Sequence, residues 1–275
     1  MNQSIKELEL WVNNTKEFEE ANVKLKFYTN DNNYKKVEDR FYAKALVKDD
    51  TLISLSLELE NKIFGICKKL SELQLTSEIV ELNIAIGNED LNYLKEFKKL
   101  ERTIIYTSTH NVDLSQNENL KSVNINYSDN TKFIYPPNLK KLDISFHNSE
   151  NINENLQNLP KPLNEITVFH RYRSNDSCLV NLDLLNNLNL STIRIVANIE
   201  SDTFNFDNHK NLEELLLIPT SSNIKVKVKV NNKIPNRIKK ITIHNASIGE
   251  IYNHKVSKLD KLSIVNCNFP SEVIQ

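Results

Sequence analysis

The stretch "LKKLDISFHN", residues 139–148, decides the fold. Leu142 and Ile144 are apolar, and the polar residue Asp143 separates them. Successive side chains of a β-strand point to opposite sides, so an apolar residue at every second position indicates a strand with one buried face. The stretch therefore predicts a short strand that buries Leu142 and Ile144 and turns Asp143 outward.

The same template, apolar-x-x-apolar-x-apolar, recurs along the chain. It occurs in residues 5–13, 52–61, 70–78, 79–88, 100–108, 120–128, 139–148, 163–171, 190–198, 212–220, 238–246 and 259–268. From residue 79 onward the starting positions advance by 21, 20, 19, 24, 27, 22, 26 and 21 residues. Self-similarity at such a period indicates a repeat protein in which each strand stacks on its neighbours, and not a two-domain enzyme.

An asparagine often stands at the ninth or tenth position of the template. These residues are Asn13, Asn61, Asn88, Asn148, Asn198 and Asn268. A buried asparagine at the end of a strand can donate its side-chain amide to backbone carbonyls of a neighbouring coil, and we expect that role here. Some repeats lack the asparagine, and Thr103 occupies an apolar position of its repeat.

The repeat resembles that of the leucine-rich repeat family, whose unit reads L-x-x-L-x-L-x-x-N/C-x-L, and the resemblance extends from Ile5 to Asn268. Three segments led by proline, "YPPNLKKLDIS", "LPKPLNEITVF" and "IPNRIKKITIH", are similar to the FNIP-type variant of that repeat. The resemblance implies an α/β-type or mostly β curved solenoid. Its parallel β-sheet would line the concave side, with irregular segments, short strands and short helices on the convex side.

We expect one domain over residues 1–275 with about 11 to 12 coils. Residues 1–50 are interpreted as degenerate repeats, with a strand in 22–30 and a helix near 34–48, where Val37, Phe41 and Ala45 are spaced like one face of a helix. Segments 70–78 and 79–88 start too close together for two full coils, so one of them must be a turn or a convex-side strand. "NIKVKVKVNN" (223–232) alternates apolar residues with lysines, which predicts a convex-side strand.

Composition excludes several function classes. The chain carries 35 basic and 36 acidic residues, so it lacks the positive charge of a nonspecific nucleic-acid binder, and we expect no nucleic-acid partner. No signal-peptide pattern and no long apolar run occurs, which predicts a cytoplasmic protein without a membrane partner. Cys67, Cys178 and Cys267 are far apart in sequence, so we expect buried free thiols and neither a disulfide nor a metal site.

Residues 169–178, "FHRYRSNDSC", resemble an active site in composition. A metal-dependent enzyme that uses His147 and His170 with Asp143 or Asp176 is a minor alternative. We expect instead that the stretch is a polar loop, that Cys178 is buried, and that the chain is neither an enzyme nor a cofactor binder. With three glycines in the whole chain, a glycine-rich phosphate loop is excluded.

Positions three, five and seven of each repeat are expected to point away from the core. Apolar, aromatic and arginine side chains at or beside these positions match the composition of interface hot spots. The candidate binding residues are Trp11, Arg102, Ile104, Tyr106, Tyr127, Phe169, Arg171, Tyr172, Arg194, Val196, Leu216 and Ile218. They predict a protein or peptide partner on the concave face.

A second function remains open, that of a structural scaffold subunit that stacks or oligomerises through its ends. Leu262 and Ile264 belong to the last repeat, and no obvious polar cap follows them. Solenoids need their terminal faces covered, so the chain could also be part of a longer protein.

Overall fold

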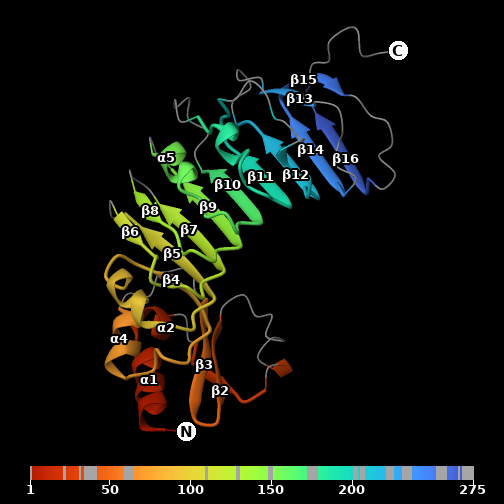
Figure 1. Ribbon diagram of the computed structural model, residues 1–275. Helices are drawn as coiled ribbons and strands as arrows, with labels where there is room; N and C mark the ends of the chain where they lie inside the picture. The colour runs from red at the N-terminus through yellow and green to blue at the C-terminus, as the bar shows by residue number, and fades with distance from the viewer. Residues whose placement is uncertain are drawn as a thin grey trace. The chain divides into compact units, whose positions relative to one another are not determined.

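The structure is a computed structural model (Figure 1). It describes residues 2–20, 23–30, 32–33, 42–58, 65–108, 111–127, 131–147, 151–171, 179–200, 204, 208–220, 226–230, 237–251, 259–265 and 267. The chain divides into an N-terminal unit, residues 1–126 and 134–138, and a C-terminal unit, residues 127–133 and 139–275.

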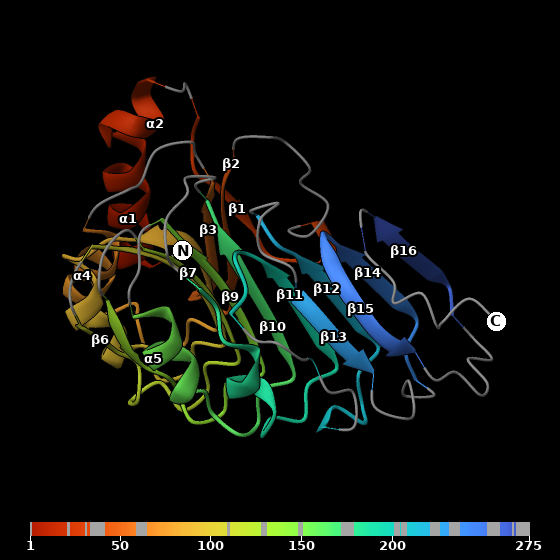
Figure 2. The ribbon, with the colours of Figure 1, turned by 90° about the horizontal axis from the view of Figure 1, so that it is seen from above.

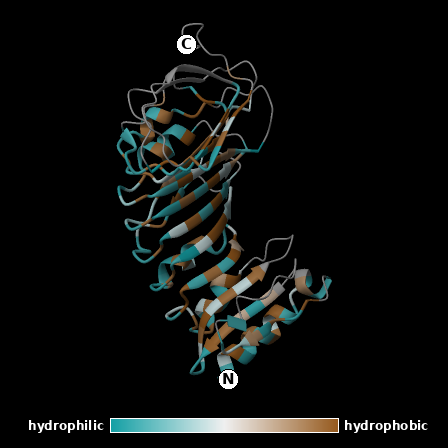
Figure 3. Cartoon of the chain, turned by 90° about the vertical axis from the view of Figure 1, so that its right-hand side faces the viewer, coloured by the Kyte–Doolittle hydropathy of each residue, from teal (hydrophilic) through white to brown (hydrophobic). Residues whose placement is uncertain are grey.

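A large, mostly parallel sheet of twelve strands dominates the structure, and helices are few (Figure 1). In spatial order its strands are β1 (Lys26–Tyr28), β2 (Tyr42–Lys48), β3 (Thr51–Glu58), β4 (Glu81–Ile86), β5 (Arg102–Thr107), β7 (Ser122–Tyr127), β9 (Lys141–Phe146), β10 (Glu165–His170), β11 (Thr192–Val196), β12 (Glu214–Ile218), β14 (Lys240–His244) and β16 (Lys261–Val265). The α/β or mostly β class expected from the sequence is confirmed at this level. Apolar and polar residues alternate along the strands (Figure 3).

Two small sheets lie apart from the large one. One pairs β6 (Asn111–Asp113) with β8 (Lys132–Ile134), and the other pairs β13 (Val226–Val230) with β15 (Ala246–Ile251). The strand expected in 223–232 is therefore confirmed over Val226–Val230. The side chains of its lysines lie outside the described residues.

The N-terminal unit begins with two helices, α1 (Gln3–Asn13) and α2 (Lys16–Glu20). The side-chain oxygen of Asn2 accepts a hydrogen bond from the N–H of Ile5 at 2.9 Å, which is the usual cap of a helix N-terminus. Ile5, Leu8 and Val12 form the buried stripe of α1, whereas Leu10 is 62% exposed. The strand expected over residues 5–13 is therefore wrong, because the spacing of Ile5, Leu8 and Val12 also fits one face of a helix.

Strands β2 and β3 form an antiparallel hairpin. Asp49 and Asp50 connect them with φ angles of 47° and 58°, as a two-residue hairpin turn of type I′ requires. The helix expected near 34–48 is thus wrong over residues 42–48, because pairing with β1 and β3 outweighs the helix propensity of that segment. Residues 34–41 lie outside the described residues, while the strand expected in 22–30 is confirmed as β1.

Helix α4 (Ile66–Glu72) includes residues 70–72, the start of the segment 70–78 that also fits the repeat template. Of the two closely spaced templates, only 79–88 forms a strand, β4. The buried carboxylate of Asp90 accepts hydrogen bonds from the N–H groups of Gly65, Cys67 and Lys68 at 3.0, 3.0 and 3.2 Å. Asp90 therefore caps α4 from a distant point in the sequence, just before the 3₁₀ helix η1 (Leu91–Glu96).

The C-terminal unit stacks its strands in one parallel register (Figure 2). One row of side chains that face the core is Leu142, Ile166, Ile193, Leu215, Ile241 and Leu262, and the next is Ile144, Val168, Ile195, Leu217, Ile243 and Ile264. All are buried except the two residues of β16. The repeat template thus specifies the core of this unit. A short helix, α5 (Ile152–Gln157), and the 3₁₀ helix η2 (Leu182–Leu185) lie between its strands in sequence.

Asparagines connect neighbouring repeats, but mostly at a position that the repeat template does not contain. Asn119 donates its side-chain amide to the Lys98 carbonyl at 2.7 Å, and Asn138 donates to the Glu118 carbonyl at 2.9 Å. Each of these asparagines directly precedes the first leucine of its repeat. The repeats are therefore linked by side-chain amides on the side where the strands begin.

The strand-end asparagines that the structure describes also link repeats through their side-chain oxygens. The side-chain oxygens of Asn88 and Asn198 accept hydrogen bonds from the hydroxyls of Thr107 and Thr220, each at 2.8 Å. Asn13 lies at the end of α1 and accepts from the N–H of Leu25. Three others, Asn61, Asn148 and Asn268, lie outside the described residues.

Candidate functional site

The outward face of the C-terminal sheet consists of the side chains that alternate with the buried rows. Its first row is Lys141, Glu165, Thr192, Glu214, Lys240 and Lys261, its second is Asp143, Thr167, Arg194, Leu216, Thr242 and Ser263, and its third is Ser145, Phe169, Val196 and Ile218. The parallel register places the members of each row side by side. One surface therefore carries a charged row, a mixed row and a largely apolar row.

The third row is the most unusual part of this face. Phe169 is 42% exposed, and Val196 and Ile218 are half-buried on the next two strands. Leu216, also half-buried, lies two positions before Ile218 on β12. The sheet already buries Val168, Ile195 and Leu217 on its other side, so the fold does not need these outward apolar groups for its core.

Arg194 occupies the middle of the second row and is held by Glu214. Its Nε and one terminal nitrogen donate to the two carboxylate oxygens at 2.9 and 3.0 Å, the paired geometry that suits a guanidinium. This hydrogen bond lowers the pKa of Glu214 and raises the pKa of Arg194, with the charges of Glu165 and Asp143 as weaker contributions to the latter. The positive charge of Arg194 is therefore already compensated by Glu214 on the same face.

Lys141 is placed between two acids on the same face. Its ammonium lies 3.7 Å from the Asp143 carboxylate and 3.9 Å from that of Glu165. The acids Asp143, Glu165 and Glu214 were not among the binding residues expected from the sequence. Each of these acids occupies an outward position of its repeat, and a basic residue occupies an outward position on the same strand or on the next one. This proximity of opposite charges is the sequence signal that would have indicated them.

Three candidates lie on β5 in the N-terminal unit. Arg102 is exposed, and Ile104 and Tyr106 are half-buried on the same side of the strand. Arg102 donates to Glu81 of β4 at 3.0 Å. Their outward orientation agrees with the sequence prediction, and they form a candidate surface of that unit.

Two candidates are corrected by the structure. Trp11 lies half-buried on helix α1 and not on a strand of the sheet. Tyr127 is 2% exposed, and its ring packs against Phe133 and Phe146 at centroid distances of 5.3 and 6.1 Å. Tyr127 follows the buried residue Ile125 at the strand period, which turns it into the core.

The stretch 169–178 is described up to Arg171. Arg171 is exposed, and its Nε donates to the Ser145 hydroxyl at 3.3 Å, so it lies beside the third row. Tyr172, Asp176 and Cys178 lie outside the described residues. Two of the three candidates from this stretch, Phe169 and Arg171, are thus near each other on the outward side.

The histidines proposed for a metal enzyme do not converge with Asp143. His170 is buried, stacks on Phe146 at 4.9 Å, and has its Nε2 2.7 Å from the His147 carbonyl oxygen, so that nitrogen must carry a proton and donate. Asp143 belongs to the opposite side of the strand. Within the described part of the chain, no group of three His, Cys, Asp or Glu side chains could hold a metal ion.

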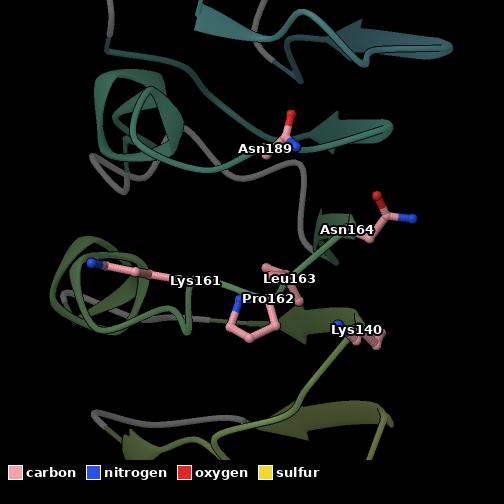
Figure 4. Close-up of a pocket in the computed structure, with 6 residues that line it drawn as sticks. All are labelled: Lys140, Lys161, Pro162, Leu163, Asn164 and Asn189. Carbon is pink, nitrogen blue, oxygen red and sulfur yellow. The ribbon is translucent and has the colours of Figure 1, made fainter.

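A pocket of about 370 Å³ opens near the starts of β10 and β11 (Figure 4). Its lining is Lys140, Lys161, Pro162, Leu163, Asn164 and Asn189. The backbone carbonyls of Lys140 and Asn164 there already accept from the next repeat, at 2.8 Å from the N–H groups of Asn164 and Ser191. The lining offers the amines of Lys140 and Lys161 and two asparagine amides but no acid, and we assign it no catalytic chemistry.

No protein-family model matches the chain, and no curated protein matches its sequence. Among the described residues, no helix is long and apolar enough to cross a membrane. The chain is thus described by its own fold and surface: a mostly parallel sheet whose strands follow a sequence repeat, with a largely apolar row on the outward face of its C-terminal unit.

Proposed function

We propose that this chain is a non-enzymatic solenoid of the leucine-rich-repeat type that binds a protein or peptide partner through the outward face of its C-terminal sheet. In this proposal the outward face is the concave side of the solenoid. The observation that carries it is the row of Phe169, Val196 and Ile218 beside the ion-paired Arg194. The repeat period and the shared parallel register support the leucine-rich-repeat assignment.

The composition of the face supports an apolar partner segment. Neighbouring strands lie about 4.8 Å apart, so Phe169, Val196 and Ile218 span about 10 Å across three strands, enough for two or three side chains of a partner. Protein interfaces concentrate binding energy in such apolar and aromatic centres and surround them with polar residues. Because Arg194 and Lys141 already face acids of this chain, the partner does not need to supply strong compensating charge.

The proposal is tested with the immobilised full chain and lysate of its source cells. We compare the unmodified chain with Phe169→Ala and Ile218→Ser, and quantify the recovered proteins by mass spectrometry. A true partner should be recovered at least about fivefold less by both variants, since loss of one hot-spot side chain costs more than about 1 kcal/mol. Direct titration of that partner against the purified chains then gives the ratio of dissociation constants.

Ile134→Ala is the matched control, because Ile134 is an apolar side chain that is 56% exposed on β8 and not on this face. Recovery should be unchanged in this variant. If partners are recovered equally by the unmodified chain and by well-folded Phe169→Ala and Ile218→Ser, as judged by circular dichroism, the outward face is not the binding surface.

A further inference from the structure

Strand β16 is the last strand in the order of the large sheet. Its residue Leu262 continues the buried row of Ile241 and Leu215, yet Leu262 is 57% exposed where Ile241 is 4% exposed. Ile264 likewise continues the row of Ile243 and is half-buried. In every earlier strand of this unit the next parallel strand covers these positions, and here the described residues provide none.

The backbone of β16 is also unpaired on one side within the described residues. The Lys261 N–H donates to the Lys239 carbonyl at 3.0 Å, and the Val265 carbonyl accepts from the Asn245 N–H at 2.9 Å. Residues of a strand alternate between the two neighbouring strands in their backbone bonds. The N–H and C=O groups of Leu262 and Ile264 therefore point to the open edge, which is a template for another strand.

The charge of Lys261, the first residue of β16, indicates which residue an added strand should carry at its own first position. In earlier repeats an acid and a base stand side by side at the start of neighbouring strands, as in Glu81 with Arg102 and Lys141 with Glu165. Lys261 stands at the same position and is exposed, without an ion pair to any described residue. An acidic residue in register beside Lys261 would complete the pattern.

We propose that the edge of β16 binds an extended segment of a partner protein as a further parallel strand with the pattern acidic, apolar, any residue, apolar. The acid would face Lys261, the two apolar side chains would cover Leu262 and Ile264, and the backbone would pair with the free groups of those two residues. The pattern is that of the chain's own strands, "EITV" (165–168) and "ELLL" (214–217). This site uses other residues than the proposed binding face and does not depend on it.

The probe is a capped synthetic peptide with the sequence of residues 163–171, "LNEITVFHR", added to the full chain. Amide hydrogen exchange is followed by NMR. Saturating peptide should slow exchange at Leu262 and Ile264 at least tenfold, whereas the amides of Lys261 and Ser263 already face β14 and should change little. Leu262→Ser should weaken binding of the peptide in a fluorescence anisotropy titration.

A charge exchange tests the register. The peptide with Glu165→Lys should bind about fivefold more weakly, and Lys261→Glu in the chain should restore its binding. Lys240→Glu is the matched control, because Lys240 is an exposed lysine in the same row one strand away from the edge. It should not restore binding.

Three results would overturn the proposal. The first is slow exchange of Leu262 and Ile264 in the free, dilute chain, which would mean that the chain covers its own edge. The second is protection that grows with chain concentration without peptide, which would favour a second copy of the chain as the occupant. The third is no added protection and no binding at millimolar peptide.

Discussion

Thr103 is a polar residue in a position that the repeat reserves for an apolar one. It lies in register with Leu82, is 4% exposed, and its hydroxyl has no hydrogen-bond partner among the described residues. A buried hydroxyl without a partner costs free energy, because it has lost its hydrogen bonds to water. This threonine is thus a local weakness of the N-terminal unit.

Replacement of Thr103 by valine should raise the free energy of unfolding by about 1 kcal/mol, since valine has nearly the same shape without the unpaired hydroxyl. The measurement is the urea unfolding midpoint at pH 7. Thr107→Val on the same strand is the control, because the Thr107 hydroxyl donates to Asn88. The free energy of unfolding of Thr107→Val should fall by about 1 kcal/mol. If the two valine variants shift the free energy of unfolding in the same direction, the interpretation of Thr103 is contradicted.

His209 is fully buried and stacks on Phe204 at a centroid distance of 5.3 Å. Burial lowers its pKa to about 4 from an ordinary value of 6.5. The unfolded chain therefore binds the proton first as the pH falls, so the neutral buried histidine contributes stability above pH 6.5 that is lost between pH 6.5 and 4. This loss amounts to about 3 kcal/mol.

The variant His209→Gln removes that titration. We expect the free energy of unfolding of the unmodified chain to fall more steeply between pH 6.5 and 4 than that of the variant, by up to about 3 kcal/mol over the interval. Urea unfolding at several pH values measures both curves. Parallel curves would show that His209 does not carry this pH dependence.

At the scale of elements, a single carboxylate, that of Asp90, accepts the hydrogen bonds of three N–H groups at the start of helix α4. Burial raises the pKa of Asp90, and its three backbone hydrogen bonds oppose that rise. Asp90→Asn keeps the shape but replaces one acceptor oxygen with a donor nitrogen. We expect a loss of about 1 to 2 kcal/mol of stability and faster chemical labelling of the buried Cys67 thiol, followed by mass spectrometry.

Asp113→Asn is the control for this substitution. Asp113 is exposed and accepts a hydrogen bond from the Ser115 N–H at 2.9 Å. Its replacement should change neither the labelling of Cys67 nor the unfolding midpoint by more than a small amount. Unchanged Cys67 labelling in Asp90→Asn would show that α4 does not need this cap.

The strand elements could be predicted from sequence because alternation over "LDISF" or "ITVFH" fits a strand and no other element. Residues 5–13 could not, because Leu8, Leu10 and Val12 alternate like a strand while Ile5, Leu8 and Val12 repeat like a helix. The side-chain cap of Asn2 and the burial of Ile5, Leu8 and Val12 within the N-terminal unit favour the helix over the strand. Likewise, five of the seven residues of β2 are Ala, Leu or Lys, which favour a helix, and pairing with the neighbouring strands outweighs that local preference.

The candidate site was predicted in part for a similar reason. Outward positions such as Phe169, Val196 and Ile218 follow from alternation alone. The paired contact of Arg194 with Glu214, two residues 20 apart in sequence, depends instead on the register between strands β11 and β12. The asparagines that link repeats could have been predicted from their position in the sequence. Asn119, Asn138, Asn189 and Asn211 each precede a leucine that opens a repeat.

For the whole molecule, the formal net charge of −1 and the internal ion pairs of the outward face predict partner binding with little salt dependence. Raising the salt from 50 to 500 mM should change the dissociation constant of a partner at this face less than about threefold. Peptide binding at Lys261 should weaken more. A strong salt dependence at the outward face would indicate that charge, and not the apolar row, directs recognition there.

The linking asparagines have a consequence for how such a chain can change in length. Each of the amides of Asn119 and Asn138 reaches back by one repeat and no further. A copy of the repeat between these two asparagines would therefore bring its own connector and would leave the neighbouring connector with a carbonyl to bind. At these two junctions the chain is therefore suited to the insertion of one whole repeat, because the hydrogen bond that links it to its neighbour comes with it.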